Sequence, residues 1–344
     1  MNAQTRAVID VGTNTIKLTV ARAGCFRIEP LLECTSRPNT RLGTGFYRHK
    51  QLLQRETMRA AADAVRDLSN RCRSYDPVSL RAIATSAVRD ARNRDEFAAL
   101  IRQKTGLSLE VLSGKTEAEW IFRGATSDFA ISQEKLLVMG FGGGSTAVIV
   151  SDLGRIQYRS FDLGAVRLME LLHLGVSPTA NDLDRCQIYL SQFFNELITP
   201  ELNSMLSSKM TGFTLVTTGG SANSLAKIKM HAQNLHWAND QTQCLNLEEV
   251  SRARARLWRL SHEERKSIPG LSGPRCDVIL PGVVILEAVM KYLGFTQMRV
   301  TQRGVRYGAL LDASESCEIP CQPDSFSYAA YDHRSSGELL HAGS

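Results

Sequence analysis

Three glycine-rich turns give the first indication of chemistry in this sequence. AVIDVGTNTIKLTV, residues 7–20, reads as an apolar run, a turn and a second apolar run, and KLLVMGFGGGSTAVIV, residues 135–150, repeats that plan. A third turn lies inside FTLVTTGGSANSLAKIKM, residues 213–230, between a strand pattern and a helix pattern. Such turns expose successive backbone N–H groups that can surround a phosphate, because glycine has no Cβ to keep the chain away. The sequence therefore predicts phosphate-type loops in both halves of the chain.

The first two turns differ in one carboxylate. Asp10 leads into the first turn, whereas Gly140 stands at the corresponding place before the second. On spacing alone, both turns could also be plain hairpin turns. The missing acid leaves open what the second turn binds.

Composition describes a globular chain with a core and an affinity for anions. Of 344 residues, 43% are hydrophobic and 22% are charged, which suits about two domains. The net charge of +6 comes from 31 Arg and 10 Lys against 35 acids, and arginine grips phosphate oxygens in pairs. A coding bias toward arginine would give the same count. We find no DNA- or RNA-binding motif and expect no nucleic-acid partner.

Neither a leader nor a membrane segment is expected. No charged start is followed by an apolar run, and no uncharged apolar run approaches 18 residues, so we expect a cytoplasmic protein that does not contact membranes. The eight cysteines are scattered without paired CxxC spacing, which indicates reduced thiols.

Alternating strand and helix patterns predict an α/β fold. The repeated hairpin, once near each half's start, suggests two similar domains that face each other across a cleft, a common place for a site. We expect the first domain over residues 1–125, with the first phosphate loop, and the second over 126–312, with the second loop and a closing helix that packs back on the first domain. Residues 313–344 are rich in Ser, Pro and Gly without periodicity and are expected to be a disordered tail.

Two charged residues stand at the ends of predicted strands. Arg89 follows the turn with Thr85 and Ser86, and Glu117 follows Ser113 and Gly114 at a helix start. Taken alone, Glu117 could be a charge that favours the helix N-terminus, and Arg89 could be a solvated or ion-paired side chain.

Nine stretches in order, over roughly residues 7–311, resemble the Ppx/GppA family. That family comprises exopolyphosphatases and guanosine pentaphosphate phosphohydrolases, and the resemblance here is to its short, two-domain form. It implies two actin-like domains (ASKHA, ribonuclease H-like) facing across a cleft. The stretches are DVGTNTIKL, RLGTG, ATSAVRDARN, LSGKTEAEWIF, GFGGGST, LGAVRLME, TTGGSANSLA, DVILPGVVIL and GVRYGALL.

The resemblance also implies roles for individual residues. Glu117 would be the general base on the attacking water, and Arg89 would hold the terminal phosphate. Phosphoryl transfer asks mainly for positioning and charge neutralisation, with one base to orient water. The implied phosphate-binding residues are Asp10, Gly12, Thr13 and Asn14 in the first loop, Gly142, Gly143, Gly144, Ser145 and Thr146 in the second, and Gly219, Gly220 and Ser221 in the third turn.

Three positions depart from the family pattern. The family's second loop reads DxGGGSTE, and its two acids hold Mg²⁺ or its neighbours, but this chain has Gly140 and Ala147 there. Thr116 replaces the first of the paired glutamates, next to Glu117. Asp10 remains as a metal ligand, and Mg²⁺ often binds through one or two protein carboxylates with water and phosphate completing its shell. We therefore expect Mg²⁺ that is weakly held or arrives with the substrate.

Three functions remain open at this point. The first, which Glu117 together with Arg89 favours and which we expect, is hydrolysis of terminal phosphoanhydride bonds in polyphosphate or guanosine pentaphosphate by an enzyme with a weakened metal site. The second is a catalytically weakened sensor that binds polyphosphate or guanosine penta- or tetraphosphate, which the residues Gly140 and Ala147 favour. The third is an actin-like kinase, for which we find no acceptor pocket. The oligomeric state, including a homodimer, is also open.

Overall fold

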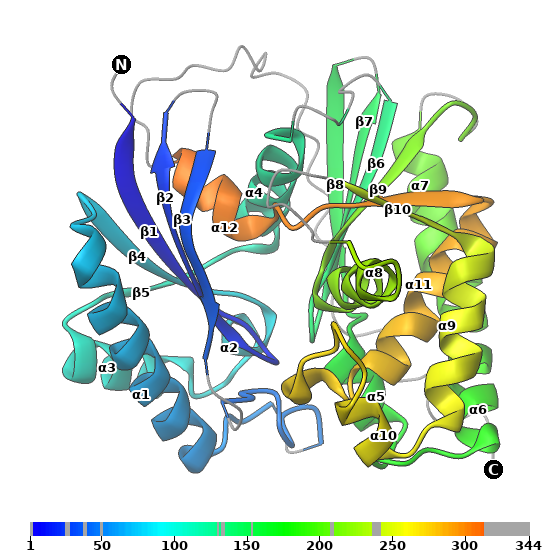
Figure 1. Cartoon of the computed structure of the whole chain (residues 1–344), viewed down its shortest axis with the longest axis horizontal. Helices are drawn as coiled ribbons and strands as arrows, with labels where there is room; N and C mark the ends of the chain where they lie inside the picture. The colour runs from blue at the N-terminus through cyan, green and yellow to red at the C-terminus, as the bar shows by residue number, and fades with distance from the viewer. Residues whose placement is uncertain are drawn as a thin grey trace.

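Two twisted sheets, each covered by helices, face each other in the computed structural model of this chain (Figure 1). The structure describes residues 3–24, 28–36, 40–48, 51–128, 131, 135–152, 154–206, 210–235 and 242–312. The sheet of the first half has the strand order β3-β2-β1-β4-β5, and the sheet of the second half has the order β10-β11-β9-β6-β7-β8. The expected tail, residues 313–344, lies outside the described residues.

The same topology is built twice. β1 pairs antiparallel with β2 and parallel with β4, and β6 pairs antiparallel with β7 and parallel with β9 in the same way. The predicted repeat of strand, turn and strand is therefore the first hairpin of each sheet. The strands are β1 (Gln4–Val11), β2 (Ile16–Ala23), β3 (Ile28–Thr35), β4 (Ser79–Ala84), β5 (Leu109–Val111), β6 (Lys135–Phe141), β7 (Thr146–Asp152), β8 (Arg155–Phe161), β9 (Thr214–Gly219), β10 (Gln243–Asn246) and β11 (Gln297–Val300).

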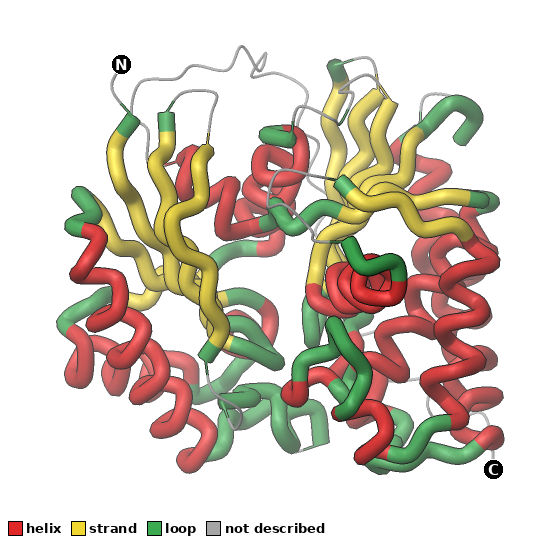
Figure 2. Tube along the Cα trace, in the orientation of Figure 1, coloured by secondary structure: helices red, strands yellow, loops and turns green. Residues whose placement is uncertain are grey.

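Helices cover the outer faces of both sheets and fill the space between them (Figure 2). The helices of the first half are α1 (Arg55–Cys72), α2 (Ser86–Arg89), α3 (Arg94–Thr105) and α4 (Gly114–Thr126). Those that follow are α5 (Ala165–Leu171), α6 (Ala180–Phe193), α7 (Thr199–Met205), α8 (Gly220–Ala232), α9 (Leu247–Arg259), α10 (His262–Lys266), α11 (Ile279–Leu293) and α12 (Val305–Asp312). The turn that we expected around Ser86 and Arg89 is the single helical turn α2.

α4 and α12 cross between the two sheets (Figure 1). α4 packs on the second sheet, against β6, β7 and β8, whereas α12 packs on the first sheet, against β1 and β2. Two glycines allow the close crossing: a Cβ on Gly124 would collide with the backbone of Gly304, and one on Gly308 would collide with the backbone of Trp120. α12, the last helix among the described residues, therefore ties the second half to the first.

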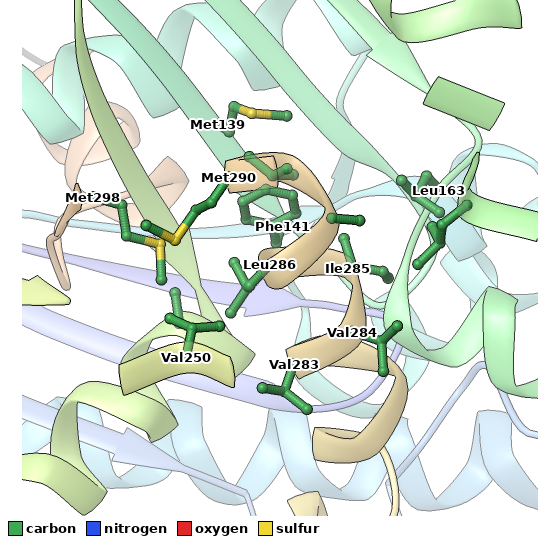
Figure 3. Close-up of a cluster of buried hydrophobic side chains, with 14 of the residues drawn as sticks. Met139, Phe141, Leu163, Val250, Val283, Val284, Ile285, Leu286, Met290 and Met298 are labelled. Atoms are coloured by element: carbon green, nitrogen blue, oxygen red, sulfur yellow. The ribbon is translucent and has the colours of Figure 1, made fainter. Parts of the chain in front are cut away.

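Apolar side chains form a large core around α11 in the second half. Every residue of α11 from Ile279 to Met290 is buried, and Leu286 and Met290 pack toward Met139 and Phe141 of β6 (Figure 3). Because α11 is apolar on nearly every side, it can be enclosed by α5, α6, α8 and α9. The segment directly before α11 carries Arg275 and Asp277.

Two smaller observations concern the remaining sequence expectations. Within the described residues, no helix combines the length and apolar character that crossing a membrane requires. Cysteines 34, 72, 186, 244 and 276 are free thiols.

Candidate active site

The first glycine turn begins directly after β1. Gly12 N–H donates to the carbonyl of Thr15 at 3.2 Å, which closes the turn between β1 and β2. Asp10 and Lys17 are register partners on these strands, just before and just after the turn. Asn14 at its tip is buried, and neither its side-chain nitrogen nor its oxygen has a hydrogen-bond partner. Because buried polar groups are normally paired, Asn14 is suited to a polar ligand.

The second turn copies this geometry with different side chains. Gly142 N–H donates to Ser145 O at 2.9 Å, as Gly12 does to Thr15 in the first turn. The register partners here are Gly140 and Ala147, which occupy the places that Asp10 and Lys17 occupy in the first hairpin. One hairpin thus brings a charged pair to the site, and the other brings two small apolar residues.

The third turn lies where β9 ends and α8 begins. Gly219 has φ +124°, a backbone conformation that favours glycine. Gly220 follows as the first residue of α8, and the guanidinium of Arg275 lies directly against it, because a Cβ on Gly220 would overlap that group. This approach brings a cation from a distant loop to the third turn.

A single cleft between the halves brings most of the predicted residues together. Ten of the fourteen are in its lining: Asp10, Gly12, Thr13, Asn14, Glu117, Gly142, Gly143, Gly219, Gly220 and Ser221. The other four are Arg89, Gly144, Ser145 and Thr146, which lie outside that lining. Thr146 uses its hydroxyl to donate to Leu163 O at 2.6 Å, and Ser145 is buried. The roles of all fourteen as ligands or catalysts stay predictions.

Glu117 reaches the cleft from the first turn of α4. Ser113 caps this helix by accepting a hydrogen bond from Thr116 N–H, so Glu117 is not needed as the cap. Glu117 Oε2 instead accepts a hydrogen bond from Arg89 Nη1 at 2.7 Å. Burial raises the pKa of the Glu117 carboxyl, and the neighbouring Arg89 opposes that rise. A carboxylate whose pKa is raised toward neutrality is better matched to general-base work.

Three cations in the cleft were not singled out from the sequence: Lys17, Arg275 and Arg306. Burial, together with Arg275 and Arg306, lowers the pKa of Lys17 to about 7. Burial and the charge of Arg41 lower the pKa of Arg275 to about 10. Lys17 and Arg306 stand within the stretches DVGTNTIKL and GVRYGALL, which was the available signal, whereas Arg275 lies in a loop that offered none.

The place of the two absent acids is filled by an apolar side chain. Ile121, one helical turn after Glu117, lies over Gly140: a Cβ at Gly140 would be 2.6 Å from Ile121 Cδ1. Ala147 is buried in the same cluster as Ile121 and Ala118. The second hairpin thus presents an apolar surface to the cleft.

The donor set for Mg²⁺ is correspondingly small. Among the described residues, no three His, Cys, Asp or Glu side chains gather in a way that could hold a metal ion. Asp10 could still serve as a single carboxylate ligand. Its buried Oδ1 lacks a hydrogen-bond partner and is the kind of hard oxygen that Mg²⁺ prefers. These residues fit a metal that is held mainly by phosphate oxygens, with Asp10 as its protein carboxylate.

Comparison with known proteins now decides the family. The family model described as "Ppx/GppA phosphatase family" matches residues 20–316. The chain belongs to the Ppx/GppA phosphatase family. It is 27% identical over 319 residues to Exopolyphosphatase 2 of Mycobacterium tuberculosis, which covers 89% of this chain and 97% of that protein.

Solved structures agree with the fold. An exopolyphosphatase from Cytophaga hutchinsonii superposes with a TM-score of 0.79 at 26% identity, covering 90% of this chain and 98% of that one. The Ppx/GppA family member of Aquifex aeolicus has a TM-score of 0.69 at 21% identity, covering 90% and 97%, and supports the fold alone. The two-domain actin-like fold expected from the sequence is thereby confirmed.

Proposed function

We propose that this protein hydrolyses terminal phosphoanhydride bonds, as an exopolyphosphatase or as a guanosine pentaphosphate 5′-phosphohydrolase. The observation that carries the proposal is the position of Glu117: a buried carboxylate that lines a cleft together with three glycine turns and three cations. The family and the name of the M. tuberculosis relative support the exopolyphosphatase class.

In the proposed reaction, a water molecule attacks the terminal phosphorus. Glu117 takes a proton from that water, a P–O bond forms, and the bridging P–O bond breaks to leave inorganic phosphate and a chain one phosphate shorter. Arg89 holds Oε2 of Glu117, so Oε1 is the oxygen that would accept the proton. Arg89 would also hold the terminal phosphate of the bound substrate, as the family pattern implies.

The remaining polar groups would neutralise and orient the chain of phosphates. Backbone N–H groups of the glycine turns provide donors without bulk. Lys17, Arg275 and Arg306 bring positive charge to the cleft from β2, the loop before α11 and the start of α12. Mg²⁺ arriving with the substrate would add charge neutralisation at the phosphate oxygens beside Asp10.

One observation favours a second candidate function, a sensor that binds these anions and cleaves them slowly. Ile121 covers Gly140 and packs with Ala147, and neither of these two positions beside the second turn carries a carboxylate that could hold a metal. Such a protein would keep the cations and glycine turns and lose turnover.

The experiment is phosphate release from polyphosphate, guanosine pentaphosphate and ATP, measured side by side with and without Mg²⁺. Release from polyphosphate or guanosine pentaphosphate, with much less from ATP, supports the hydrolase. Tight binding of the same anions with negligible release would support the sensor instead. Absence of both binding and release would refute both proposals.

A further inference from the structure

Arg41 joins the two halves of the protein at one end of the cleft. It lies in the RLGTG loop between β3 and α1, and it binds the carboxylate of Asp277 in the other half. Nη1 donates to Asp277 Oδ2 at 2.6 Å and Nη2 to Oδ1 at 2.9 Å, while Nη2 also donates to Pro274 O at 3.1 Å. The side chains of Arg41 and Asp277 are only 21% and 17% exposed. A two-pronged contact of this kind fixes geometry as well as charge.

The segment that Arg41 grips is also held from within its own half. Arg265, a fully buried side chain, donates through Nε to Cys276 O at 2.7 Å. Pro274 and Cys276, the two neighbours of Arg275, are therefore each bound by an arginine. The side chain of Arg275 makes no hydrogen bond or ion pair within the described part of the chain, and its guanidinium lies in the cleft against Gly220.

The loop that carries Arg41 is tied in turn to the first glycine turn. Gly43 N–H donates to Thr13 O at 2.8 Å. Loops from both halves meet in this region, below the crossing helices in Figure 2. A continuous path of contacts therefore runs from the first glycine turn through Arg41 to the loop of Arg275 and on to the third turn.

We propose that Arg41 is a positioning residue for phosphate binding, which fixes residues 274–277 so that Arg275 presents its guanidinium at the third glycine turn. There Arg275 binds an inner phosphate of the chain, behind the terminal phosphate. This inference rests on the proposed function, because it assumes a polyphosphate chain in the cleft.

The physical reason lies in the surroundings of Arg275. A cation in a partly buried place without an anionic partner costs free energy, so its segment must be held for the side chain to stay there. Arg41 and Arg265 supply that hold, and a phosphate would supply the missing partner.

The test is a double-mutant cycle with tripolyphosphate as the probe. We expect Arg275→Ala and Arg41→Ala each to raise the Kd for tripolyphosphate about tenfold, measured by calorimetry, which is the scale of one charge-assisted contact. Because Arg41 acts through Arg275, the Arg41→Ala/Arg275→Ala protein should bind no more weakly than Arg275→Ala. In turnover, KM should rise and kcat should change little.

A matched control is the ion pair of Arg159 with Glu201, which lies within the second half and is similarly shielded. Arg159→Ala should bind tripolyphosphate as the parent does.

If Arg41→Ala does not fold, as judged by circular dichroism, Asp277→Asn serves in its place, since an asparagine Oδ1 can still accept from Val278 N–H. Additive losses in the cycle, or parent-like binding by Arg41→Ala, by its substitute or by Arg275→Ala, would overturn the inference. A parent that neither binds nor cleaves tripolyphosphate or longer chains would overturn the proposed function instead.

Discussion

Arg89 and Glu117 form an ion pair of 2.7 Å that joins helices α2 and α4, and Glu117 lines the cleft. The pair affects the ionisation of a buried carboxyl group. Burial alone would favour its protonated form, and the guanidinium favours the ionised form. The two residues therefore act on each other before any substrate binds.

Replacing Glu117 tests the base directly. Glu117→Gln should keep the affinity for polyphosphate and lower turnover by roughly 10²–10⁴-fold, the usual range for removal of a general base. The neighbouring Glu119→Gln, on the same helix, is the control and should turn over like the parent. Phosphate release and calorimetric binding measure the two effects. Unchanged turnover in Glu117→Gln would exclude Glu117 as the base.

Removing Arg89 should shift the pH dependence. Without its charge the pKa of Glu117 rises further, so the ionised base exists only at higher pH. We expect the acidic limb of the kcat/KM profile of Arg89→Ala to lie at higher pH than in the parent. The control is Arg94→Ala, an exposed arginine on α3.

Arg89→Ala should also bind polyphosphate and guanosine pentaphosphate more weakly, and to a similar degree, because Arg89 is expected to touch the phosphate end that both share. An unmoved acidic limb would argue against the coupling of Arg89 to Glu117. A binding defect for one ligand alone would argue against its placement at the phosphate.

Local patterns in the sequence were sufficient to predict the helices and strands and many of the residues that line the cleft. The hairpin of Asp10 and that of Gly140 share one apolar-turn-apolar pattern, and they form corresponding strands of the two sheets. Glu117 was expected at a helix start, and it lies in the first turn of α4. Patterns of this kind depend on residues close in the chain, which is why they could be read without a structure.

Long-range placement could not be read in the same way. Arg275 reaches Gly220 from 55 positions away in the chain, and nothing in its own loop distinguishes it from a surface arginine. Ile121 looks like an ordinary apolar helix residue, and only the fold shows that it lies over Gly140. Arg167 bridges the two halves, because it pairs with Asp90 of the first half and donates to Gly144 O of the second.

The helix crossing gives a stability prediction. A methyl group on Gly308 would collide with the backbone of Trp120, so Gly308→Ala should force α4 and α12 apart. We expect it to lower the free energy of unfolding by about 1–3 kcal/mol, the range for overpacking. Gly175→Ala is the matched control, because nothing lies within 4 Å of a Cβ there. Urea denaturation measures both, and equal stability of the two variants would contradict the tight crossing.

The Arg41–Asp277 pair predicts a stability difference that depends on pH. Its hydrogen bonds and charge hold the pKa of Asp277 below the ordinary value of 3.8 in the folded protein. The ionised form therefore stabilises the fold fully above that ordinary value, and the stabilisation is lost as pH falls through the lower folded pKa. Asp277→Asn should be less stable than the parent at pH 7, and the gap should shrink below about pH 4. The exposed Asp184→Asn is the control, and a gap that does not change with pH would contradict the ion pair.

The absent acids of the second hairpin give the last prediction. Gly140 does not adopt positive φ, so an aspartate there meets no backbone strain, but its Cβ would press on Ile121. Gly140→Asp with Ala147→Glu should therefore recover a metal site more fully when Ile121→Ala is added. Each tenfold in rate corresponds to about 1.4 kcal/mol, and a metal at the phosphate oxygens can contribute several. We expect the triple variant to release phosphate from polyphosphate at least ~10-fold faster than the parent and at lower Mg²⁺, with a smaller gain in the double variant.

Ile121→Ala alone measures the effect of removing that side chain, and circular dichroism and melting confirm that each variant is folded. A folded triple variant with the parent's rate and Mg²⁺ dependence would show that these two positions do not govern metal use in this chain.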